Sequence, residues 1–116
     1  MTLTRQATLT GPDDFSFVFA KAKKIYGPHL TVLVRPNGRG AARLGLAVSK
    51  KHTGNAVVRN RVRRIVKESF RHHREQLGGL DIVVLSKRGV AEVERRELRQ
   101  AIDQQWQSTL KKCRRS

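Results

Sequence analysis

The sequence predicts one small α+β domain in which a strongly basic helix connects two strands. Two apolar, β-branched runs at residues 30–35 and 42–49 flank a cluster of turn-forming residues. A segment from Ala56 to about Gln76 has the helical period, and a third apolar run at residues 81–86 follows it. With 116 residues and 38% hydrophobic content, the chain fits one domain with a modest core.

The expected domain spans residues 1–116, with flexible ends at residues 1–9 and 112–116. Its first element is a short helix that begins near Pro12, where proline presets the first turn, and ends at about Lys23. Three of the four phenylalanines lie in this helix, at positions 15, 17 and 19. Two interpretations stay open: ordinary core packing, or an aromatic wall on which unpaired bases stack.

Residues 30–35 and 42–49 are expected to pair as neighbouring antiparallel strands, because the turn cluster from Pro36 to Gly40 separates them. In the second run, apolar residues alternate with small, polar or basic ones, so one face is buried and the other is partly basic. Residues 81–86 are expected to form a strand that is buried on both faces.

The helix expected from Ala56 to about Gln76, with Asn55 as its N-cap, is the most informative segment. At about 100° per residue, its apolar and small residues share one sector: Val58, Val62, Ile65, Val66, Ser69 and Phe70. The opposite sector is polar and contains Asn60, Arg61, Arg63, Arg64, Lys67 and Arg71. Arg59 lies at the boundary between them. The apolar side docks the helix and the basic side faces a partner, although a solvated basic face stays open as the alternative.

A last helix is expected from Val90 to about Lys112. Its inward stripe contains Val93, Leu98, Ala101, Ile102, Trp106 and Leu110. Its arginines alternate with glutamates, at Arg95, Arg96 and Arg99 and at Glu92, Glu94 and Glu97. This mixture is typical of a solvated helix rather than of a binding face.

The charge distribution predicts a polyanionic partner. The chain carries 25 Lys and Arg against 9 Asp and Glu, a net charge of +16, and no acidic residue lies between Phe15 and Lys67. Such a field attracts phosphates and makes binding sensitive to salt. Membrane binding would need an apolar anchor, and neither an anchor, a membrane span nor a secretory signal is evident, so we expect a cytoplasmic protein.

Catalytic chemistry is sparse in this sequence. His72 and His73 diverge by about 100° on a helix and have no third ligand nearby, so we expect no metal site. His29 and His52 flank basic segments, where loop histidines usually have no special role. Cys113 is the single cysteine and is expected to be a free thiol. We therefore expect no bound cofactor and no cleavage of RNA by the protein alone.

Two consecutive segments closely resemble the bacterial ribonuclease P protein component. They are residues 43–51, Arg-Leu-Gly-Leu-Ala-Val-Ser-Lys-Lys, and residues 54–64, Gly-Asn-Ala-Val-Val-Arg-Asn-Arg-Val-Arg-Arg. The Arg-Asn-Arg core at residues 59–61 is the signature of that family. Further matches are Asp14-Phe15 with Val18-Phe19, residues 68–71 and residues 81–85.

The resemblance implies a small two-layer sandwich, like the second domain of a ribosomal protein. A mostly antiparallel sheet of about four strands would carry three helices, with a left-handed βαβ crossover through the basic helix. Parallel crossovers are right-handed in about 98% of cases, so the residues alone would have predicted the opposite hand.

The resemblance also implies a function as the protein subunit of ribonuclease P. The catalytic RNA would position Mg²⁺ to remove the 5′ leader of precursor tRNA, and one protein monomer per RNA would assist. The implied RNA-binding residues are Lys50, Lys51, Asn55, Arg59, Asn60, Arg61, Arg63, Arg64 and Lys67. The implied leader cleft contains Phe15, Phe19, Leu33, Arg35 and Arg43. Some family members have an aromatic residue on the first cleft strand where this chain has Thr31, Leu33 or Arg35, so stacking there is expected to be weaker.

Two other functions agree with parts of this sequence. A structural RNA-binding protein of ribosomal type would explain the charge and the fold equally well but not the signature segments. A DNA-binding helix is disfavoured, because no helix-turn-helix partner precedes Ala56 and no dimer surface is evident.

Overall fold

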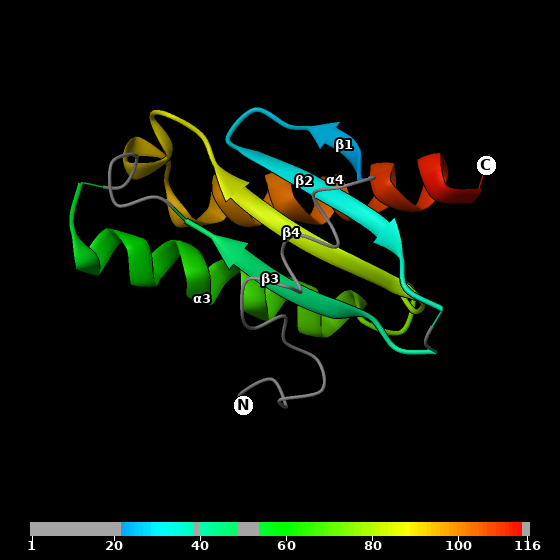
Figure 1. The fold of residues 1–116 in the computed structure, drawn as a ribbon. Helices are drawn as coiled ribbons and strands as arrows, with labels where there is room; N and C mark the ends of the chain where they lie inside the picture. Colours follow the sequence, from blue (N-terminus) through cyan, green and yellow to red (C-terminus); the bar gives the residue numbers. More distant parts are fainter. Residues whose placement is uncertain (1–21, 39, 49–53, 115–116) are drawn as a thin grey trace.

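The computed structural model describes residues 22–38, 40–48 and 54–114. In this part of the chain, two α-helices pack on one face of a four-stranded sheet (Figure 1). The strands are β1 (Lys23–Tyr26), β2 (Leu30–Pro36), β3 (Arg43–Ala47) and β4 (Leu80–Ser86). The helices are α3 (Ala56–His73) and α4 (Arg95–Arg114), and a 3₁₀ turn, η2 (Val90–Glu92), precedes α4.

The strand order is β1-β2-β4-β3. Two of the three pairings, β1 with β2 and β2 with β4, are antiparallel, whereas β3 and β4 are parallel. The predicted pairing of residues 30–35 with residues 42–49 is therefore wrong, because β4 lies between those strands. The physical reason is that β4 is buried on both faces, and a central position gives each of its rows of backbone groups a hydrogen-bonding neighbour.

Strand β1 occupies the place where the sequence predicted the end of the first helix. Lys23 begins this strand, and only Ile25 among its four residues is buried, so the alternation is too short to indicate a strand. The remainder of the expected helix, before Ala22, lies outside the described residues. The third helix of the expected fold therefore stays a prediction.

Helix α3 begins as predicted, because the Asn55 side chain accepts a hydrogen bond of 2.9 Å from the backbone N–H of Val58. The helix ends at His73, three residues before the predicted end, and Gly79 then adopts a left-handed φ of 85° that leads into β4. Since β3 and β4 are parallel neighbours, α3 is the crossover between them. The left hand of that crossover stays a prediction.

Helix α4 begins later than predicted. Val90 starts the η2 turn, and Val93 is extended, with φ −86° and ψ 132°, so the α-helix begins only at Arg95. The predicted inward stripe is confirmed, because Val93, Leu98, Ala101, Ile102 and Trp106 are buried and Leu110 is partly buried against the core.

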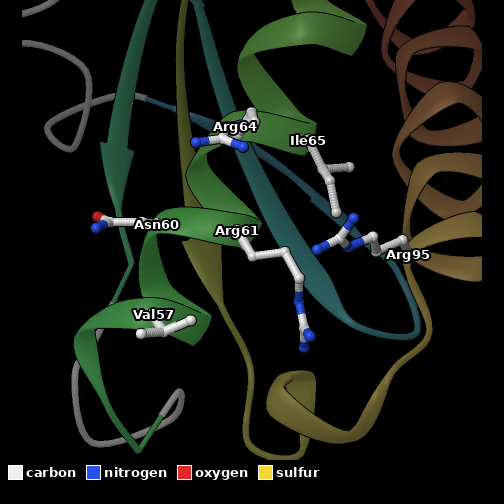
Figure 2. Close-up of a pocket in the computed structure, with 6 residues that line it drawn as sticks. All are labelled: Val57, Asn60, Arg61, Arg64, Ile65 and Arg95. Carbon is white, nitrogen blue, oxygen red and sulfur yellow. The ribbon is translucent and has the colours of Figure 1, made fainter.

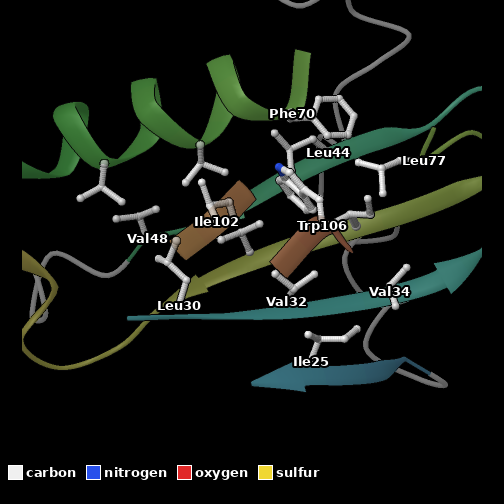
Figure 3. Packing of buried hydrophobic residues seen from close by; sticks show 14 of the residues in the cluster. Ile25, Leu30, Val32, Val34, Leu44, Val48, Phe70, Leu77, Ile102 and Trp106 are labelled. Atoms are coloured by element: carbon white, nitrogen blue, oxygen red, sulfur yellow. The ribbon is translucent and has the colours of Figure 1, made fainter. Parts of the chain in front are cut away.

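The core lies between the sheet and the two helices (Figure 3). Alternate residues of β2 and β4, such as Val32 and Val84, face this core. The rings of Phe70 and Trp106 meet edge to face, with centroids 6.1 Å apart. This packing fixes α3 against both β3 and α4, so the opposite side of α3 has a defined orientation.

A polar bridge also joins the two helices. The indole N–H of Trp106 donates a 2.8 Å hydrogen bond to the hydroxyl oxygen of Ser69, and that hydroxyl donates to Asp103. Arg99 in turn donates to the same carboxylate at 3.1 Å. Ser69 and Trp106 are fully buried, so this bridge satisfies polar groups that water does not reach.

Candidate nucleic-acid interface

The predicted apolar sector of α3 is confirmed. Val62, Val66, Ser69 and Phe70 are buried, and Val58 and Ile65 are partly buried against the core. The polar residues of the opposite sector and of its boundary differ in exposure. Asn60, Arg64 and Lys67 are exposed, and Arg59, Arg61 and Arg63 are half-buried.

Arg59 lies at the boundary between these sectors, as predicted. Its Nε is buried and has no hydrogen-bonding partner among the described residues. Arg61, two residues further along, donates a 3.2 Å hydrogen bond from Nη2 to the backbone carbonyl oxygen of Ala91. This bond fixes Arg61 against the η2 turn without neutralising its charge.

Charge compensation differs between the two halves of α3. In the second half, the Oε1 atom of Glu68 lies 3.4 Å from Nη2 of Arg71 and 3.9 Å from Nε2 of His72. In the first half, by contrast, Arg61 and Arg64 form no ion pair within the described part of the chain. The uncompensated positive field of α3 is therefore concentrated in its first three turns.

A pocket of about 360 Å³ opens on this first half of α3 (Figure 2). Its lining residues are Val57, Asn60, Arg61, Arg64 and Ile65 from α3 and Arg95 from α4. The sequence alone did not indicate Arg95 as a site residue, because its helix carries mixed charges. No local pattern indicated it, because the pocket forms only where α4 packs on α3.

Three residues of the predicted leader cleft share the sheet face opposite α3 and α4. Leu33 is buried there beside Val83. Arg35 and Arg43 lie on either side of Asp81 in the strand register. The structure thus brings these three residues onto one face.

Asp81 holds one of these arginines in place. Arg43 donates from Nε and Nη2 to the two carboxylate oxygens of Asp81, at 2.8 and 2.6 Å. Asn37 donates to the same carboxylate at 2.8 Å, and Asp81 is fully buried. Because its charge is compensated within the protein, Arg43 would bind phosphate more weakly than an unpaired arginine.

Four residues of the predicted sites, Phe15, Phe19, Lys50 and Lys51, lie outside the described residues. Within the described part, no three His, Cys, Asp or Glu side chains form a group able to hold a metal ion. Neither described α-helix combines the length and the apolar character that a membrane crossing requires.

Sequence and structure comparisons agree on one family. The sequence model of the family described as Ribonuclease P matches residues 3–110. The ribonuclease P protein component of Pectobacterium atrosepticum is 42% identical over 102 residues, which cover 88% of this chain and 86% of the relative. That of Nitrosococcus oceani is 40% identical over 110 residues, covering 95% and 92%.

The fold agrees as well. The ribonuclease P protein of Staphylococcus aureus superposes with a TM-score of 0.83, covering 89% of this chain and 94% of its own, at 24% identity. A likeness at that identity shows a shared fold, and the sequence matches over nearly the whole chain show the shared family. This chain belongs to the bacterial ribonuclease P protein family.

Proposed function

We propose that this chain is the protein subunit of ribonuclease P and binds both the catalytic RNA and the 5′ leader of precursor tRNA. The RNA performs the Mg²⁺-dependent endonucleolytic removal of the leader that leaves the mature 5′ end of the tRNA. The protein acts in the cytoplasm as one monomer per RNA and has no active site of its own. The observation that carries the proposal is the uncompensated cationic first half of α3, in a chain of this family.

The protein assists by reducing repulsion between two polyanions. The catalytic RNA and the precursor tRNA repel each other, and a protein with a net charge of +16 bridges them. Each phosphate that the protein neutralises is one fewer that Mg²⁺ must screen. The effect of the protein is therefore greatest when Mg²⁺ is scarce.

Two different surfaces bind the catalytic RNA and the leader. The polar side of α3, together with Lys50 and Lys51 before it, binds the catalytic RNA, and its rigid docking on the core supports a fixed orientation of the arginines. The sheet face with Leu33 and Arg35 holds the leader together with the first helix. These surfaces lie on different sides of the molecule, because α3 covers the opposite face of the sheet.

In this proposal the catalytic RNA, and not the protein, binds the magnesium ions. A protein site for Mg²⁺ would need clustered carboxylate or carbonyl oxygens. Asp81 is already bound by Arg43 and Asn37, and the described residues do not gather three acidic or histidine side chains. The donor set of the described chain thus does not fit a metal-dependent nuclease centre.

The test is cleavage of precursor tRNA by bacterial ribonuclease P RNA transcribed in vitro, with and without this protein, across a magnesium series. We expect faster leader removal with the protein, most of all at low magnesium, and no cleavage by RNA-free protein. Binding without acceleration would identify a structural RNA-binding protein instead. Cleavage by rigorously RNA-free protein would contradict the assignment of chemistry to the RNA.

A further inference from the structure

The pocket between α3 and the start of α4 combines charge with apolar surface. Arg95 reaches from α4 toward α3, and Arg61 extends toward the η2 turn (Figure 2). Arg64 and Asn60 line the same pocket from α3. Three arginines from two helices thus line a space of about 360 Å³, near the lower end of the range for small-molecule sites.

No carboxylate lines this pocket. Three arginines elsewhere in the described chain have acidic partners: Arg43 pairs with Asp81, Arg71 with Glu68 and Arg99 with Asp103. In the same part of the chain, Arg64 and Arg95 have neither an ion pair nor a hydrogen bond. Like charges held together without a counter-charge destabilise the free protein, and a bound anion would remove that cost.

The position of Arg95 adds a second electrostatic argument. It is the first residue of α4, where the helix dipole is positive and a cation is unfavourable. Glu94 precedes it but does not line the pocket, and Glu97 lies 3.6 Å from His29. The dipole of α4 therefore adds to the positive potential around Arg95.

The other lining residues indicate more than a bare phosphate. Val57 is 79% exposed, the highest exposure among the large apolar residues of the described chain, and Ile65 lines the pocket about two turns further along α3. The Asn60 amide carries both a donor and an acceptor, as reading a base edge requires. Apolar side chains, an amide and several cations together match one unstacked nucleotide with its phosphate.

We infer that this pocket binds one unstacked nucleotide of the ribonuclease P RNA and that Arg95, which lies outside α3, is one of its phosphate ligands. Arg61, Arg64 and Arg95 bind the phosphate groups, and Val57 contacts the base or ribose. The inference rests on the proposed function, which it deepens by adding α4 to the RNA-binding surface.

The test compares Arg95→Ala with Arg96→Ala, a neighbouring exposed arginine that does not line the pocket and loses the same charge. Affinity for in vitro transcribed ribonuclease P RNA is measured over a series of salt concentrations. Removing one phosphate contact is expected to weaken binding about five- to tenfold near 0.1 M salt and to lower the salt slope by roughly 0.7–0.9. Val57→Ala is expected to weaken binding without changing the slope.

Chemical probing of the RNA bases supplies a second readout. Wild-type protein should protect one unpaired nucleotide, whose reactivity returns with Arg95→Ala but not with Arg96→Ala. Equal effects of the two arginine changes, or no effect of either, would overturn the inference while leaving the proposed function intact. Failure of wild-type protein to bind this RNA at all would overturn the proposed function, and the inference with it.

Discussion

Arginines of one helix serve different physical purposes in this protein. Arg59 buries its Nε at the edge of the core, Arg61 is fixed by the carbonyl of Ala91, and Arg64 extends into solvent without a partner in the described chain. Their shared positive charge was evident from the sequence. The contact of Arg61 depends on the η2 turn, which follows some 30 residues later, so helical periodicity could not predict it.

The double change Arg61→Ala with Arg64→Ala should reduce affinity for the catalytic RNA and flatten its salt dependence. Neither side chain belongs to the apolar core, so the fold should survive. Two lost phosphate contacts should lower the salt slope by roughly 1.4–1.8. The matched control is Arg88→Ala with Arg96→Ala, two exposed arginines away from the pocket. Parallel salt lines for wild type and the Arg61/Arg64 variant, with circular dichroism showing a folded protein, would mean that α3 does not contact the RNA.

At the scale of elements, local signals predicted β2, β3, β4, α3 and most of α4, but not β1, and they predicted the arrangement of the strands poorly. The capped start of α3 and the doubly buried β4 followed from Asn55 and from the apolar run at residues 81–86. The partner of β2 did not follow, because the turn cluster after Pro36 favours a hairpin and says nothing about a later strand entering between β2 and β3. The pocket was missed for the same reason, since Arg95 meets Arg61 only through the packing of α4 on α3.

Ser69→Ala should loosen the attachment of α3 to α4. The change leaves the buried indole N–H of Trp106 without its acceptor and removes the donor to Asp103. An unsatisfied buried donor costs about 1–3 kcal/mol, which should appear as a lower free energy of unfolding in urea. Ser108→Ala, at an exposed position of the same helix pair, should change it by less than about 0.5 kcal/mol. Equal free energies of unfolding for the two variants would show that the hydrogen bonds of Ser69 contribute nothing to stability.

For the whole molecule, a net charge of +16 acts in opposite directions on stability and on binding. The free protein is destabilised by repulsion among its own cations, whereas its complex with RNA depends on the same cations. Salt weakens both effects, since the Debye length falls from about 30 Å at 0.01 M to about 3 Å at 1 M.

Raising the salt concentration should therefore increase the Tm of the free protein while it decreases affinity for RNA. Thermal unfolding followed by circular dichroism gives the first quantity, and titration with ribonuclease P RNA gives the second. A Tm that falls with added potassium chloride would show that attractive ion pairs, such as Arg43 with Asp81, outweigh the repulsion.

The central place of β4 has a consequence for the protein during its synthesis. β2 and β3 are not neighbours in the sheet, because β4 lies between them. The sheet therefore cannot form completely until the end of β4, Ser86, has emerged from the ribosome. The cations up to Arg64 emerge 22 residues earlier, which at about 5–20 residues per second is roughly 1–4 s. During that interval the basic segment lies beside ribosomal RNA before the sheet that supports it has formed. Nascent chains that stop before Leu80 should keep this basic segment exposed and bound to ribosomal RNA. Their dissociation from the ribosome should become more complete only in chains long enough to include all of β4.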